Sequence, residues 1–141
     1  VIYFSLIADN SRSAAAYNNN LCIVYMKTSD LMNLGAYNDF GIIHAPGYDV
    51  NDADIIQNPN TGKWHLFYKP ENGTVKINML VSDNAIGPYT SPVSDAAGLD
   101  IFPTVSEALE GGNGFFDNNG NLVMFADAFG HGTSYFYVTK T

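Results

Sequence analysis

The residues best suited to chemistry are two carboxylates that stand at the same place in two similar stretches. Asp52 begins DADIIQNPNTGKWHLFY, and Glu110 begins EGGNGFFDNNGNLVMFA. Each stretch passes through a polar turn ending in glycine, at Gly62 or Gly120, and then enters a hydrophobic run. The acids are 58 positions apart, and so are the glycines. Two carboxylates held in one site can act as a general acid and a second, ionised group, because burial and a neighbouring negative charge keep a proton on one of them.

Other acids compete for these two positions. Glu107 lies three residues before Glu110 and replaces it if the register slips. Asp54 projects to the same side of its strand as Asp52 and is the alternative there. Asp127, in MFADAFGHG, ends a second hydrophobic run and is a candidate for the rim of a pocket. The alternative for each of these acids is a solvated loop residue without a functional role.

The composition restricts the kind of ligand. The chain of 141 residues has six Lys and Arg against 14 Asp and Glu, and its net charge is −8. An acidic surface repels phosphate backbones, so nucleic acid is excluded as a partner, and an anionic membrane surface is disfavoured for the same reason. Aromatic residues make up 13% and charged residues only 14%, a balance that suits neutral ligands such as sugars.

Sugar rings stack on aromatic side chains, and their hydroxyls bond to polar groups. Phe115 and Phe129 lie near predicted inner loops and are stacking candidates, and His131 stands between two glycines in a predicted pocket loop. His44, His65 and His131 lack the spacing of metal ligands. We therefore expect no metal and no cofactor.

The elements that position these residues are short strands. The apolar runs are rich in β-branched and aromatic residues and are bounded by turn residues, and no convincing helix is present. The predicted strands cover residues 1–7, 21–26, 52–57, 63–69, 75–82, 113–116, 121–126 and 134–140. A meander repeated at a period above 50 residues is typical of a β-propeller blade. We predict an all-β fold, an incomplete propeller of about three blades in a single partial domain, with units at about 1–35, 50–90 and 108–141.

The repeat also predicts what the chain lacks. Residues 1–7 match the second strand of a blade, so the first strand of that blade is expected before Val1. A closed propeller normally has at least four blades, and an open arc exposes apolar sheet faces. We therefore expect a homo-oligomer that covers these faces. We expect no signal peptide within this sequence, and we nevertheless expect an extracellular or secreted location.

Several motifs in order resemble a blade of the family 43 glycoside hydrolases. They are Asp52-Ala53, Gly62-Lys63-Trp64, Phe67-Tyr68-Lys69, Ser82-Asp83 and Gly87-Pro88-Tyr89. The next blade resembles the Glu-Gly-Pro unit of that family, with Glu110-Gly111-Gly112 in its place, and KTSDLMNLG resembles the family's Ser-x-Asp-Leu-x-x-Trp ending, with Leu34 replacing Trp. The resemblance covers most of this chain, and about three-fifths of a complete catalytic domain.

The resemblance implies a five-bladed propeller that inverts the anomeric centre of arabinose- or xylose-containing plant polysaccharides. By position, Glu110 matches the general acid and Asp52 matches the aspartate that tunes it, with Asp54, Asp127, Phe115, Phe129 and His131 as further substrate-binding candidates. The general base belongs to the strand expected before Val1. We therefore hold two hypotheses: an arabinofuranosidase- or xylosidase-like hydrolase that is impaired as a lone chain, and a non-catalytic carbohydrate-binding module.

Overall fold

The computed structural model shows a protein made of antiparallel β-sheets. It describes residues 2–7, 21–28, 30, 32–33, 39–73, 76–128 and 135–140. Within these residues every regular element is a strand, which confirms the predicted all-β class. No helix in the described ranges has the length and apolar character needed to cross a membrane.

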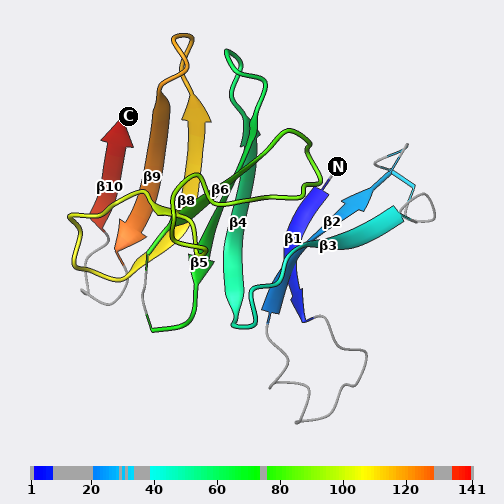
Figure 1. The fold of residues 1–141 in the computed structure, drawn as a ribbon, viewed down its shortest axis with the longest axis horizontal. Coiled ribbons are helices and arrows are strands. Elements are labelled where there is room, and N and C mark those ends of the chain that lie inside the picture. The colour runs from blue at the N-terminus through cyan, green and yellow to red at the C-terminus, as the bar shows by residue number, and fades with distance from the viewer. Residues whose placement is uncertain are drawn as a thin grey trace.

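Three sheets follow one another along the chain and lie side by side (Figure 1). The first sheet contains β1 (Ile2–Ile7), β2 (Leu21–Lys27) and β3 (Asp39–His44) in that order. The central sheet contains β4 (Val50–Gln57), β5 (Trp64–Pro70), β6 (Asn78–Ser82) and β7 (Leu99–Asp100). The third sheet contains β8 (Leu109–Phe116), β9 (Leu122–Ala128) and β10 (Tyr135–Lys140). Each sheet is a meander of sequential strands, the arrangement expected of propeller blades.

Two of these strands were not predicted. β3 (Asp39–His44) is interrupted by Gly41, and a glycine within a short run weakens the alternation by which strands are recognised. β7 consists of two residues only, Leu99–Asp100, and pairs with Asn78 and Met79 at the edge of the central sheet. The first and central sheets therefore extend further along the chain than the units predicted around 1–35 and 50–90.

The central sheet is covered on both faces by apolar cores. One core joins it to the third sheet and includes Phe67, Ile77, Leu109 and Met124. The other core joins it to the first sheet and includes Ile23, Val50, Leu66, Tyr68 and Leu80. Burial of these side chains is the main force that stacks the sheets, because antiparallel sheets alone leave one face in water.

The first strands of the central and third sheets contain the same irregularity. In β4, Asn51 pairs with Lys69 and Asp54 with Phe67, so Asp52 and Ala53 together oppose one residue of β5. In β8, Glu110 pairs with Asp127 and Asn113 with Phe125, so Gly111 and Gly112 together oppose one residue of β9. We call these two-residue irregularities the β4 bulge and the β8 bulge. Each begins with a residue at positive φ, 51° at Asp52 and 60° at Gly111.

The bulges correct the predicted alignment of the two stretches. Gly62 and Gly120 do occupy equivalent turns, with φ of 71° and 80°. Ahead of the turns, however, Asp52 is equivalent to Gly111, and Glu110 is equivalent to Asn51. The prediction that Asp52 and Glu110 hold the same place in their strands is therefore wrong by one residue. The turn after β8 is one residue shorter than the turn after β4, and this difference absorbs the shift.

Candidate functional site

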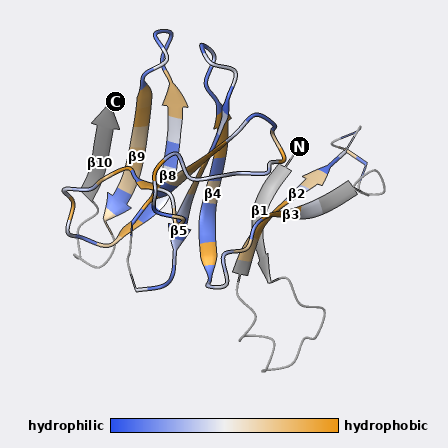
Figure 2. Ribbon diagram, viewed as in Figure 1, coloured by the Kyte–Doolittle hydropathy of each residue, from blue (hydrophilic) through white to orange (hydrophobic). Residues whose placement is uncertain are grey.

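Four polar residues form a row across the central and third sheets, at the ends of the strands where β4 and β8 begin. Asn51 on β4 pairs with Lys69 on β5, and Glu110 on β8 pairs with Asp127 on β9. Lys69 Nζ lies 2.5 Å from Glu110 Oε1 and joins the two pairs. We call Asn51, Lys69, Glu110 and Asp127 the polar row. The hydrophilic lower parts of β4, β8 and β9 are visible in Figure 2.

Lys69 is the most buried charged residue of the row. Its side chain is 5% exposed and also lies 2.8 Å from Glu71 Oε1, through its Nζ. Burial opposes the charge on Lys69, but the hydrogen bonds and charges of Glu110 and Glu71 outweigh it and raise the pKa of Lys69 above its ordinary value. Lys69 is therefore a fixed ammonium group beneath two carboxylates.

Glu71 completes this group from the residue after β5. The hydrogen bond from Lys69 lowers the pKa of Glu71, against a smaller effect of burial, and Asn51 Nδ2 donates a further bond to Glu71 Oε1 at 2.9 Å. The side chains of Glu71 and Glu110 are 36% and 35% exposed. The site thus has a buried cation as its floor and two accessible carboxylates above it.

Asp52 and Asp54 join β4 to β8 through the backbone. Asp52 Oδ2 accepts a hydrogen bond from Gly111 N at 3.1 Å, and Asp54 Oδ2 accepts one from Gly114 N at 3.0 Å. Asp52 is exposed, whereas Asp54 is half-buried, and burial raises the pKa of Asp54 despite its backbone hydrogen bonds from Gly114 and Ile55. The structure therefore brings Asp52 beside Gly111, the residue after Glu110, and the shared pocket expected for Asp52 and Glu110 stays a prediction.

The remaining candidates fall in different places. Asp127 is opposite Glu110, and its Oδ1 atom is buried without a hydrogen-bond partner, as is Oδ1 of Asn51. Glu107 lies in the loop before β8, where its carboxylate accepts from Ser106 Oγ at 3.4 Å. Phe115 is 51% exposed and stacks on Phe125, with ring centroids 6.3 Å apart, five residues beyond Glu110 along β8. At about 3.3 Å per residue this separation is roughly 17 Å, so Phe115 lies outside the polar row. Phe129 and His131 lie outside the described residues.

Lys69, Glu71 and Asn51 were not proposed from the sequence. A signal was present, because Lys69 and Glu71 directly follow the apolar run WHLFY. A lysine that ends a buried strand needs a carboxylate partner, since an unpaired buried charge is strongly destabilising. The sequence could have suggested Glu71 as a partner, but Glu110, 41 positions away, required the stacking of two sheets.

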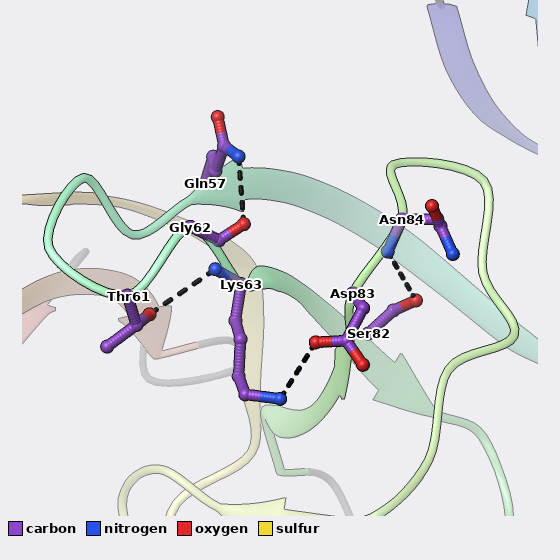
Figure 3. Close-up of polar contacts among 7 residues, drawn as sticks. All are labelled: Gln57, Thr61, Gly62, Lys63, Ser82, Asp83 and Asn84. Atoms are coloured by element: carbon purple, nitrogen blue, oxygen red, sulfur yellow. Dashed lines mark hydrogen bonds and ion pairs between the residues drawn. The ribbon is translucent and has the colours of Figure 1, made fainter.

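The motifs Gly62-Lys63 and Ser82-Asp83 lie at the other end of the central sheet (Figure 3). Gln57 Nε2 donates to Gly62 O at 2.8 Å, and Lys63 Nζ lies 2.9 Å from Asp83 Oδ1. The side chains of Lys63 and Asp83 are 51% and 82% exposed, so this ion pair contributes little to stability. These motif residues shape the turns and take no part in the polar row.

No cluster of three or more metal-binding side chains occurs among the residues that the structure describes. No protein-family model matches the chain, and no curated protein matches it. Solved structures do match. The chain folds as part of a β-propeller.

Three of the similar structures are polysaccharide-degrading enzymes by name. An endo-1,4-beta-xylanase from Bacteroides thetaiotaomicron matches 99% of this chain with a TM-score of 0.58 and 14% identity. An endo-arabinase from the same organism matches 89% with a TM-score of 0.52 and 14% identity. A putative exo-beta-1,3-galactanase from Bifidobacterium bifidum matches 84% with a TM-score of 0.50 and 16% identity.

At these identities the likeness concerns the fold, and it confirms the predicted arc of propeller blades. The chain spans 46% of the xylanase, 52% of the arabinase and 39% of the galactanase. It therefore corresponds to between two-fifths and about half of each of these proteins.

Proposed function

We propose that this chain is the carbohydrate-recognising part of a propeller of the family 43 glycoside hydrolase type, and that its polar row binds oligosaccharides containing arabinose or xylose. The observation that carries the proposal is the accessible Glu110 carboxylate, fixed at 2.5 Å by the buried Lys69 where β4 and β8 meet. Carboxylates held in place in this way are good acceptors for sugar hydroxyls. A secreted location suits such a ligand and is part of the proposal.

Two further observations support a neutral ligand such as a sugar. The net charge of −8 disfavours anionic ligands. The names of two similar structures, an endo-1,4-beta-xylanase and an endo-arabinase, point to plant polysaccharides with xylose or arabinose.

Hydrolysis is the second candidate function, favoured by the position of Asp52 beside Glu110. In this assignment Glu110 is the general acid and Asp52 tunes it. A general acid must present a proton to the leaving oxygen, whereas the structure engages Glu110 in an ion pair with Lys69. The geometry therefore favours binding over hydrolysis for this chain.

The test is a titration of xylo- and arabino-oligosaccharides into the 141-residue protein by calorimetry, together with assays on nitrophenyl arabinofuranoside and xyloside. Glu110→Gln is expected to weaken sugar binding about tenfold, the effect of one lost charge-assisted hydrogen bond. Asp83→Asn, which removes an exposed carboxylate at the other end of the sheet, is the matched control and is expected to bind normally. Equal affinity in all three proteins would contradict the site, and turnover that survives in Glu110→Gln would rule out Glu110 as the acid.

A further inference from the structure

Lys69 contacts Glu110 in a way that the packing of the sheets alone does not require. Lys69 follows Phe67 and Tyr68 on β5 and precedes Pro70, and residues 66–70 are all buried. The neighbouring side chains Phe67 and Tyr68 are apolar fillers of the two cores. A methionine or leucine at position 69 would continue this packing. Burying the Lys69 ammonium group there instead costs desolvation free energy.

Two carboxylates from different parts of the chain offset that cost. Glu71 is two residues away on the same strand end, and it alone would give Lys69 one partner at 2.8 Å. Glu110 comes from the third sheet, and its contact is the shorter one, at 2.5 Å. Asn51 Nδ2 donates to Glu71 and so holds the second partner in place. Glu71, directly after β5 in the central sheet, thus holds Lys69 in place, and Lys69 contacts Glu110 of the third sheet.

We propose that Lys69 is the positioning residue of the sugar site: it fixes Oε1 of Glu110 across the boundary between the central and third sheets, so that Oε2 is held in place to accept a sugar hydroxyl. The proposal rests on the function proposed above. Lys69 itself is too deeply buried to touch the ligand, because only 5% of its side chain is exposed. Its effect on the ligand is transmitted through Glu110.

The first experiment does not require a ligand. The 141-residue protein is labelled with ¹³C at glutamate side chains, the Glu110 signals are assigned with Glu110→Gln, and the order parameter of the Glu110 side chain is measured at pH 7. An ion pair to a buried partner restrains the rotamers of a glutamate side chain. In Lys69→Met the order parameter of the Glu110 side chain is expected to fall below that of the wild type. An unchanged order parameter would overturn the proposal.

Two further variants keep the test decisive if Lys69→Met does not fold. Lys69→Arg keeps the charge and is expected to leave the order parameter of Glu110 close to that of the wild type. Glu71→Gln keeps the contact between Lys69 and Glu110 and removes the competing anion, so the order parameter is expected to rise or stay constant. A clear fall in either variant would overturn the proposal as well.

The second experiment uses xylotriose and arabinotriose as ligands at pH 7. Lys69→Met is expected to lose about tenfold in affinity, as Glu110→Gln does, and the double variant is expected to lose no more than either single one. If the wild type binds neither sugar while the order parameter of Glu110 still falls in Lys69→Met, the proposed function fails and the role of Lys69 toward Glu110 stands. If sugar binds and the order parameter does not change, the role of Lys69 fails and the function stands.

Discussion

The β4 bulge and the β8 bulge share one backbone geometry but differ in every side chain. Asn51, Asp52, Ala53 and Asp54 in β4 correspond to Glu110, Gly111, Gly112 and Asn113 in β8. β8 carries its acid before the bulge, whereas β4 carries one acid within the bulge and another directly after it. The acids are therefore not equivalent by position, and they approach one another only because the two strands lie in contact.

The difference shows how the two sheets depend on each other. Asp52 and Asp54 of the central sheet accept hydrogen bonds from the backbone of β8, and Glu110 of the third sheet pairs with Lys69 of the central sheet. Each sheet thus satisfies polar groups of the other. Replacing residues of one bulge by their counterparts in the other separates the parts that hold the sheets together from the parts that serve a ligand.

The largest effect is expected from Gly112→Ala, which copies Ala53 of the β4 bulge. A Cβ atom on Gly112 would lie 2.9 Å from Cγ2 of Ile77, a fully buried residue of the core between the central and third sheets. We expect this overpacking to lower the free energy of unfolding by about 2–3 kcal/mol, as measured by urea denaturation. The reverse exchange, Ala53→Gly, is the control and is expected to cost about 1 kcal/mol or less. Equal costs would mean that the two bulges are packed alike.

An intermediate effect is expected at Asp54, whose counterpart is Asn113. Asp54→Ala leaves Gly114 N without its acceptor and is expected to cost about 1–3 kcal/mol. Asp54→Asn keeps an oxygen that can accept this bond and removes a carboxylate whose pKa is raised by burial.

The pH dependence distinguishes these two variants. Because the pKa of Asp54 is higher in the folded protein than in the unfolded chain, its ionisation destabilises the fold, and this penalty appears as the pH rises through the folded pKa. Asp54→Asn should therefore be more stable than Asp54→Ala at every pH. Its stability relative to the wild type should be highest near neutral pH, should fall as the pH drops through the raised folded pKa of Asp54, and should level off at about pH 3, where Asp54 is protonated in both states. A constant difference between Asp54→Asn and the wild type from pH 3 to pH 7 would contradict the assignment.

The smallest effect on stability is expected from Asp52→Gly, which copies Gly111. This exchange removes the strain of a non-glycine residue at φ of 51°, which stabilises the fold by about 1 kcal/mol. It also removes the hydrogen bond to Gly111 N, which destabilises the fold by about the same amount. Asp52→Ala keeps the strain and loses the bond, so it should be less stable than Asp52→Gly by about 1 kcal/mol. If both variants unfold at the same urea concentration, the positive φ carries no strain.

The sequence predicted eight of the ten described strands and the glycine turns at Gly62 and Gly120. These features depend on local patterns, such as apolar alternation and glycine at positive φ, and on a repeat that survives in both stretches. It did not predict the bulges. One bulge has the sequence Asp-Ala and the other Gly-Gly, so the two share no sequence pattern that indicates a bulge. It also did not predict the link from Lys69 to Glu110, which is decided by the stacking of sheets and not by spacing along the chain.

β5 packs against both neighbouring sheets. β5 directs Leu66 and Tyr68 into the core shared with the first sheet and Phe67 into the core shared with the third. Separating the central sheet from either neighbouring sheet would therefore expose buried side chains on one face of β5. Unfolding of the described sheets is therefore expected to be cooperative around β5, and the backbone amides of Leu66, Phe67 and Tyr68 are expected to be the last to exchange with deuterium.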